Sequence, residues 1–345
     1  MSILSGKNSD FFGLDIGTSG IRLAKIAHPT NTLQTYAYMP IDPKISMSDS
    51  KSDQQQLAQA VKALVSKSGI RTKSVAVGLP SQRVFMAVVD IERLSKEELA
   101  KTIRLQADSL IPTPIADSKI DWELIGTSPQ DKTKVEILLS SVPNNYVEGR
   151  LDLLENIGLN VIAFEPDSLA LVRSLVAPDV SQAQMVLDMG NFSTDLVIIL
   201  NGTPRLIRSI PTGYDAIIKA AIQNLNIDEA QARQFVAKFG LNAQKLEGQI
   251  FHAISGTVDL LMSEVDKSIK FFTTRYQGTK IERIIVAGNA SSLPDFPVYL
   301  ANKFTLNVEV GNSWRNVSYS QDRQNELLAL SAQFSVALGL AERRE

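Results

Sequence analysis

The chain has 345 residues, a formal net charge of −2 and 44% apolar residues, which favours two packed cores over disorder. No stretch gathers Lys and Arg into the basic face that nucleic acid or an anionic membrane would require of a direct partner. The absence of cysteine excludes disulfides, thiolate zinc sites and cysteine nucleophiles. Since the sequence also lacks the ~20-residue apolar run of a membrane span and the layout of a signal peptide, we expect a cytoplasmic protein.

The first predicted unit is a β-hairpin with an acid at its mouth. An apolar strand, Phe11 to Ile16, carries Asp15 near its end, and the turn Gly17-Thr18-Ser19-Gly20 leads into a second strand, Ile21 to Ala27. The following pattern predicts a strand over 32–41, a loop over 42–53, a helix over 54–66 and a strand over 75–79.

The segment from Pro80 to Asn156 has a different character and predicts a compact α+β insert. We expect strands over 83–91, 119–125 and 134–142, and helices over 95–110 and 144–156. Ser95 and Glu98 form a capping box at the start of the first helix, and the prolines that follow it end that helix near Ile111. A strand over 161–164 and a helix over 168–176 come next, and the polar crossover 177–181 marks a boundary between two lobes.

The second half begins as the first half does. A strand over 185–190 carries Asp188, and after the turn Asn191-Phe192-Ser193-Thr194 come strands over 195–200 and 204–210. Helices are predicted over 215–225, 228–239, 246–276, 293–304 and 326–340, with one more strand over 281–287. We therefore assign residues 10–79, 157–182 and 320–345 to a first lobe, 80–156 to the insert and 183–319 to a second lobe.

The two Asp-x-Gly hairpins predict a duplicated phosphate clamp. Asp188 follows Asp15 by 173 residues, about half the chain. Exposed turn amides and the hydroxyls of Thr18, Ser19, Ser193 and Thr194 can cradle phosphate oxygens, while the two carboxylates orient Mg²⁺ through water. One such turn is common in ordinary hairpins, whereas two copies favour the clamp. No Walker A pattern and no Gly-x-Gly-x-x-Gly after a strand is present, so an actin-type arrangement is the phosphate-binding architecture that fits.

Four further features are weaker candidates, each with a structural alternative. Gly213 opens a helix whose N-terminus suits an anion, and the turn at Gly288 and Asn289 lets a purine or ribose approach the backbone. Glu165, at a strand end, is a candidate for orienting water toward a γ-phosphate, with Asp167 only capping the next helix. Glu264 and Lys267 are candidates for an adenosine contact, or form an ordinary solvated pair.

These motifs resemble those of the PilM family, the actin-like proteins of type IV pilus assembly, which are themselves similar to FtsA. Residues 12–22 look like the family's first phosphate motif, and Leu187 to Gly190 with Ser193-Thr194 look like its second. The insert carries the more specific likeness, in residues 103–114 followed by Asp121-Trp122-Glu123. Phe164-Glu165, Thr212-Gly213, 264–272 and 287–289 are similar to the remaining family segments.

The resemblance implies an α/β, two-lobed actin-like ATPase fold with ribonuclease H-like sheets and an FtsA-type extra subdomain in the first lobe. It further implies ATP and Mg²⁺ as ligands, and a first lobe and insert that bind the short N-terminal cytoplasmic tail of a PilN-like bitopic membrane protein in a nucleotide-dependent way. A related type II secretion platform would share these parts. Motor ATPases of pilus assembly or retraction are further implied partners, and membrane contact is expected through the partner at the inner face of the cytoplasmic membrane. The candidate nucleotide contacts are Asp15, Gly17, Thr18, Ser19, Arg22, Asp188, Gly190, Asn191, Ser193, Thr194, Gly213, Glu264, Lys267, Gly288 and Asn289.

The chain departs from the family pattern at a few positions. Arg22 stands where Lys is usual, Tyr214 and Asn289 replace expected glycines, and Asn191-Phe192 is bulkier than usual, so we expect slow ATP hydrolysis at most. Two alternatives stay open. An actin-fold small-molecule kinase would share the first motif, and an FtsA-like filament protein would share the fold but usually ends in an amphipathic membrane helix, which the pattern through Glu345 does not predict.

Overall fold

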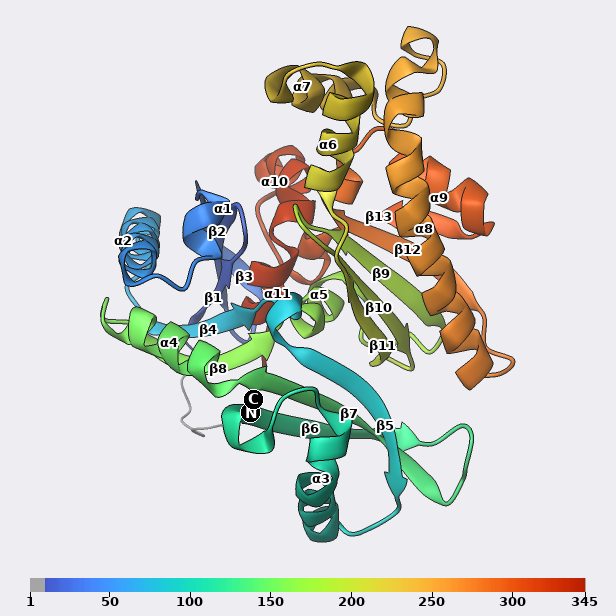
Figure 1. Ribbon diagram of the computed structural model, residues 1–345. Coiled ribbons are helices and arrows are strands. Elements are labelled where there is room, and N and C mark those ends of the chain that lie inside the picture. Colours follow the sequence, from blue (N-terminus) through green and yellow to red (C-terminus); the bar gives the residue numbers. More distant parts are fainter. Residues whose placement is uncertain (1–9, 345) are drawn as a thin grey trace.

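The computed structural model describes residues 10–344, apart from the side chain of Ala107 (Figure 1). Two five-stranded sheets have the strand orders β3-β2-β1-β4-β8 and β11-β10-β9-β12-β13. In each sheet the first strand pairs antiparallel with the second, the second antiparallel with the third, and the first parallel with the fourth. The two lobes therefore repeat one topology, as the two hairpins predict.

The strands of the first sheet are β1 Phe12–Ile16, β2 Gly20–Ala27, β3 Thr32–Pro40, β4 Ser74–Leu79 and β8 Asn160–Pro166. Those of the second sheet are β9 Ala183–Met189, β10 Thr194–Leu200, β11 Thr203–Ile210, β12 Ile281–Gly288 and β13 Asn307–Val310. The insert forms a separate sheet of order β5-β7-β6, from β5 Phe85–Glu92, β6 Ser118–Thr127 and β7 Lys134–Pro143, with helix α3 Lys96–Leu110 on it.

Helices cover both faces of each large sheet. The first-lobe helices are α1 Pro43–Ser46, α2 Lys51–Ser68, α4 Asn144–Glu155, α5 Asp167–Leu175, α10 Gln324–Leu330 and α11 Ser335–Ala341. The second-lobe helices are α6 Tyr214–Leu225, α7 Glu229–Phe239, α8 Gln249–Arg275 and α9 Phe296–Phe304. No helix within residues 10–344 is both long and apolar enough to cross a bilayer.

Several predicted boundaries need correction. The helix predicted over 246–276 starts at Gln249, because Leu246 and Glu247 have φ of 48° and 51°, in the left-handed region. The helix predicted over 326–340 is two helices, α10 and α11, separated by the 3₁₀ turn Ser331–Gln333. The insert also ends earlier than residue 156, since Leu153 and Leu154 of α4 belong to the core of the first lobe.

Helices α5 and α11 form the seam between the lobes. Leu171 and Leu175 of α5 pack on the second sheet against Val186 and Ile285, whereas Leu338 of α11 packs in the first lobe. Figure 1 shows both helices in the middle of the molecule. Their backbones approach so closely at Gly339 that a Cβ atom there would lie 1.9 Å from the carbonyl oxygen of Ala170. Glycine at this position therefore sets how closely the two helices pack.

We expect Gly339→Ala to lower the free energy of unfolding by about 1–3 kcal/mol, because the added methyl group forces α5 and α11 apart. Thermal melting followed by circular dichroism measures the effect. Gly149→Ala in α4 is the control, because nothing lies within 4 Å of a Cβ atom at that position. It should raise the stability by about 0.4–1 kcal/mol. Equal melting temperatures for Gly339→Ala and the wild type would contradict the close-packing argument.

Candidate functional site

The turns of both hairpins line one cleft of about 340 Å³ between the lobes. The structure thus brings together most of the predicted site. The predicted residues that line the cleft are Asp15, Gly17, Thr18, Ser19, Arg22, Asp188, Gly190, Asn191, Ser193, Gly288 and Asn289. Arg22 comes from β2, and the others come from the ends of β1, β9 and β12 and from the turns that follow these strands.

The first hairpin carries its own counter-charge. The turn closes through a hydrogen bond that the Gly17 amide donates to the Gly20 carbonyl, with an N···O distance of 3.0 Å. Arg22 lies opposite Asp15 in the β1–β2 register, and its Nη1 atom is 3.4 Å from an Asp15 carboxylate oxygen. The Arg22 guanidinium also stacks on the Tyr38 ring, 5.2 Å from its centroid. Burial raises the pKa of Asp15, and the charge of Arg22 opposes that rise.

The second hairpin is supported from behind by the start of α6. The amide of Gly190 donates to the carbonyl of Ser193 at 2.8 Å, while the amide of Tyr214 donates to the Gly190 carbonyl at 3.0 Å. A Cβ atom at Gly213 would lie 2.5 Å from the Asn191 carbonyl oxygen, so this glycine permits the contact. Gly213 therefore positions the turn and does not itself line the cleft.

Three other predicted residues have structural roles beside the second hairpin. Thr194 is fully buried, and its hydroxyl donates to the Thr212 carbonyl at 2.7 Å, so it faces the protein and not the cleft. Gly288 has φ of 61°, and a Cβ atom there would lie 2.3 Å from an Asp188 carboxylate oxygen. The glycine thus makes room for that carboxylate. Asn289 donates from its amide to the side-chain oxygen of Asn191 at 2.8 Å, which joins the β12 turn to the hairpin.

Two further carboxylates, Asp167 and Asp195, line the cleft and were not assigned a ligand role from the sequence. Asp195 lies opposite Asp188 in the β9–β10 register and accepts a hydrogen bond from the Ser209 hydroxyl at 2.6 Å. The Oδ1 atom of Asp167 has no hydrogen-bond partner among the described residues. Counting residues outward from the turn at 190–193 would have found Asp195, because the pairing follows from the hairpin.

Crowding of these carboxylates changes their acidity. Burial, followed by the charges of Asp195 and Asp15, raises the pKa of Asp188 to about 7. Burial, followed by the charges of Asp15, Asp195 and Asp188, also raises the pKa of Asp167 well above its ordinary value. Among the described residues, four carboxyl groups therefore share the cleft with one guanidinium group, that of Arg22, and a bound cation would favour their ionised forms.

The expectation that Glu165 orients water in the cleft is wrong. Its side chain is 4% exposed, forms ion pairs with Arg173 and with Arg343, the latter at 3.3 Å, and does not line the cleft. Asp167, two residues later and at the start of α5, occupies the cleft instead.

The expected adenosine contacts Glu264 and Lys267 also lie elsewhere. Glu264 accepts hydrogen bonds from Arg208 Nη2 at 3.1 Å and from Lys267 Nζ at 2.6 Å, and neither residue of α8 lines the cleft. The reason is that α8 packs beside β11, the edge strand of the sheet, so its polar side chains meet that strand.

The donor set fits a hydrated magnesium ion. Within residues 10–344, no group of three or more Asp, Glu, His or Cys side chains is arranged to hold a metal directly. Magnesium commonly keeps several water ligands and contacts one or two carboxylates together with substrate phosphates. Asp15 and Asp188, which face one cleft from two hairpins, meet that requirement through water.

Comparison with known proteins identifies the family. The family of type IV pilus assembly protein PilM matches residues 13–345 of the chain. The chain belongs to this family. A solved PilM-PilN type IV pilus biogenesis complex superposes with a TM-score of 0.82, at 24% identity over 96% of this chain and 97% of that one. The family membership supersedes the small-molecule kinase alternative.

Two more distant structures confirm that this PilM family member has the actin-like ATPase fold. The ethanolamine utilization protein EutJ from Carboxydothermus hydrogenoformans matches with a TM-score of 0.57 and 14% identity, over 96% of this chain and 88% of that one. MreB5 of Spiroplasma citri bound to AMPPNP matches with a TM-score of 0.54 and 12% identity, over 97% and 95%. At this level of identity the likeness concerns the fold.

The raised pKa of Asp188 predicts a pH dependence of stability in the absence of ligands. The folded protein holds the Asp188 proton up to about pH 7, whereas the unfolded chain releases it near 3.8. Because the folded state binds the proton more tightly, the free energy of unfolding falls as the pH rises through this window. Asp188→Asn removes that loss, so its melting temperature should rise relative to the wild type between about pH 5 and about pH 8. Glu123→Gln, at an exposed position, is the control and should follow the wild type at every pH.

Proposed function

We propose that this PilM family member binds ATP with Mg²⁺ in the cleft between its lobes and binds the cytoplasmic N-terminal tail of a PilN-like membrane protein. The observation that carries the proposal is the pair of hairpins, whose turns and aspartates face one another across a single cleft, in a chain that matches the PilM family from residue 13 to 345. Membrane attachment then comes through the partner.

The residues of the cleft divide the work of nucleotide binding. Turn amides and the hydroxyls of Thr18, Ser19 and Ser193 bind phosphate oxygens, and the small turn at Gly288 leaves room for the nucleoside. When bound, Mg²⁺ supplies the positive charge that the carboxylates lack. Asp167, with its unpartnered Oδ1 atom, replaces Glu165 as the group that orients a water molecule. The MreB5 match, a protein solved with AMPPNP, supports a nucleotide in a cleft of this fold.

Substitution of Asp188 tests the nucleotide proposal. We expect Asp188→Ala to weaken Mg·ATP binding roughly 10- to 100-fold, since contacts to charged groups contribute about 1.5–3 kcal/mol. Isothermal titration calorimetry on the full chain measures the affinity. Lys267→Ala is the matched control and should bind as the wild type does, because Lys267 lies outside the cleft. Unchanged affinity in Asp188→Ala would sink the paired-hairpin proposal.

A second site, a groove of about 480 Å³, lies between the insert and the first lobe. Its walls come from β6 and β7 on one side and from β8 and α4 on the other. Strands β6 and β8 are edge strands of their sheets, so each has backbone groups on one side that no strand of its sheet engages. An extended peptide can pair with such an edge while its side chains fill apolar pockets between the strands.

The groove suits an apolar peptide that carries positive charge. Val161, Ile162 and Leu151 provide apolar surface, whereas the charged residues of the lining are Asp121, Glu148, Glu155 and Lys119, a net charge of −2. The solved complex that superposes on this chain contains PilM together with PilN, which supports a PilN-like tail as the occupant. We therefore assign the groove to this tail.

A charge placed in the groove tests this assignment. We expect Leu151→Arg to weaken binding of a synthetic PilN tail peptide by about 5- to 30-fold, the effect of losing one interface anchor. Fluorescence anisotropy with a labelled peptide reads the affinity. Leu105→Arg makes the same substitution on α3 at a side chain that is 85% exposed and outside the groove, and it should leave binding unchanged. If both variants bind the peptide as tightly as the wild type, the tail binds elsewhere.

A further inference from the structure

The insert belongs to the first lobe by sequence but is held to the second lobe by its contacts. The chain enters it from β4 through the 3₁₀ turn Ser81–Arg83 and leaves it at Pro143 into α4, so both connections lead to the first lobe. In Figure 1, however, the far ends of β5 and β7 extend toward β11 and the end of α8. A buried polar cluster joins them there.

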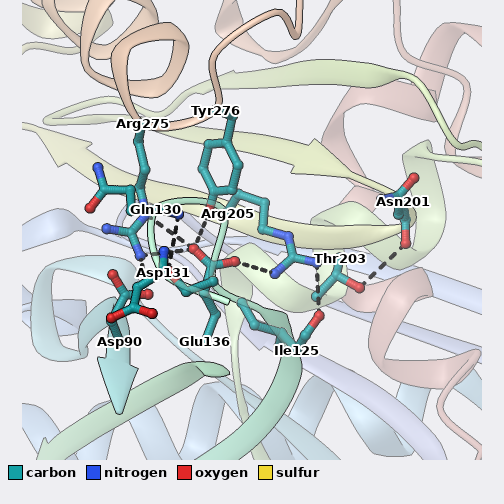
Figure 2. A network of polar contacts seen from close by, with 11 residues as sticks. Asp90, Ile125, Gln130, Asp131, Glu136, Asn201, Thr203, Arg205, Arg275 and Tyr276 are labelled. Carbon is teal, nitrogen blue, oxygen red and sulfur yellow. Dashed lines mark hydrogen bonds and ion pairs between the residues drawn. The ribbon is translucent and has the colours of Figure 1, made fainter. Parts of the chain in front are cut away.

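We call this group the Glu136 cluster; it consists of Asp90, Glu136, Arg205, Arg275 and Tyr276 (Figure 2). The Glu136 carboxylate of β7 accepts hydrogen bonds from Arg205 Nη1 at 2.7 Å, Arg275 Nη2 at 2.8 Å and the Tyr276 hydroxyl at 2.7 Å. Arg275 Nη2 also donates to Asp90 of β5 at 2.8 Å. The cluster thus joins two insert strands to β11 and to the C-terminal end of α8.

The Glu136 cluster fixes the insert firmly because its charges are balanced and its central pair, Glu136 and Arg205, is buried. Glu136 is 1% exposed and Arg205 is 8% exposed, and two carboxylates face two guanidinium groups. Removing one partner of a buried pair leaves an uncompensated charge, so such contacts resist partial breakage. Arg205 Nη2 donates in addition to the backbone carbonyl of Ile125 on β6, at 2.8 Å. All three insert strands are therefore attached to the second lobe.

Two strands of the insert run from this cluster to the groove. In the β6–β7 register Gly126 pairs with Glu136 at the cluster end, whereas Asp121 pairs with Ser140 and Lys119 with Val142 at the groove end. The residues at the second end line the groove. Five steps of a strand, from Glu136 to Ser141, span roughly 17 Å. The paired strands thus connect the second lobe, at one end, to the groove at the other.

The contact between the insert and the first lobe is weaker than the Glu136 cluster. It includes an ion pair between Lys119 and Glu148 at 3.3 Å, with both side chains at least 36% exposed, and a small apolar cluster of Leu79, Val142 and Val147. Exposed ion pairs contribute little, about 0–1 kcal/mol. When the lobes move, the contact that changes is consequently the one that forms the groove.

From this arrangement we propose that the insert moves as one body with the second lobe, through the Glu136 cluster, and that a change in lobe closure therefore changes the groove. The identity of the groove's occupant rests on the proposed function. Nucleotide in the cleft would regulate the groove by changing the position of the second lobe, and with it that of the insert. By reciprocity, a peptide in the groove then changes the affinity of the cleft for nucleotide by the same factor.

Distances between pairs of spin labels, measured by double electron–electron resonance, test the movement without any peptide. The chain contains no cysteine, so pairs of spin-labelled cysteines can be introduced at the exposed positions Glu123 in β6, Asp152 in α4 and Lys270 in α8. With Mg·AMPPNP, the distance between 123 and 152 should shift, while the distance between 123 and 270 should keep its mean and width. A shift of the 123–270 distance with a constant 123–152 distance would overturn the proposal.

A variant of the cluster tests the anchor in the absence of nucleotide as well. In Glu136→Gln the 123–270 distance distribution should broaden. Glu92→Gln is the matched control, because it removes the carboxylate of an exposed ion pair with Lys134 on the same sheet, and its distribution should stay as in the wild type. Identical distributions in Glu136→Gln and the wild type would overturn the proposal. If Glu136→Gln does not fold, the charge-balanced double variant Glu136→Gln/Arg205→Gln takes its place.

Peptide binding then measures the regulation. In the wild type we expect AMPPNP to change the dissociation constant of the tail peptide by about fivefold or more, and in Glu136→Gln this ratio should approach one while each ligand alone still binds. A wild-type ratio of one, or a ratio that Glu136→Gln leaves unchanged, would overturn the coupling. Absence of peptide binding in the wild type would contradict the groove assignment instead. The distance measurements would still test whether the insert moves with the second lobe.

Discussion

Repulsion among carboxylates in one cleft is the constraint on which the rest of the molecule depends. Each sheet ends one of its central strands in an aspartate, and the seam helices α5 and α11 hold the two sheets so that Asp15 and Asp188 meet. Asp167 and Asp195 add to the same surface. Among the described residues that line the cleft, Arg22 supplies the one Lys or Arg side chain, so ionisation of the four carboxyl groups is disfavoured and the pKa values of Asp167 and Asp188 are raised. A ligand that brings a cation stabilises the closed arrangement of the lobes.

The sequence predicted the parts of the fold that depend on local pattern. The hairpins follow from apolar strands around glycine-containing turns, and the capping box is confirmed, since the Ser95 amide donates to a Glu98 carboxylate oxygen at 3.0 Å. The buried stripe of α8, including Ile250, Ile254 and Val258, follows from its spacing. The duplicated order of the sheets could be anticipated because the pattern around Asp15 recurs around Asp188.

The missed features depend on contacts between segments far apart in the sequence. At the junction of β8 and α5 the side-chain period changes from two to 3.6 residues, so spacing alone could not say whether Glu165 or Asp167 faces the cleft. The spacing of α8 likewise identifies its buried face but not Arg208, the strand residue that Glu264 meets. Glu136 stood inside a correctly predicted strand, yet its partners lie 69 to 140 residues further along the chain. The helix predicted over 326–340 is interrupted by the turn Ser331–Gln333, where the Ser331 hydroxyl accepts a hydrogen bond from the distant backbone amide of Ser313.

Charge balance divides the molecule into parts that respond to ligands and parts that do not. In the Glu136 cluster the protein supplies both signs of charge, so the contact is complete without any ligand and holds one geometry. Among the described residues of the cleft, four carboxyl groups face one guanidinium group, so a cation from outside would favour their ionised forms. The strand pair β6–β7 is held firmly at the Glu136 cluster, whereas the contact across the cleft changes when a ligand binds. Movement of the lobes is therefore expected at the remaining weak contact, between the insert and the first lobe. The groove between β8 and the insert lies at this contact, where two sheet edges are available to a peptide.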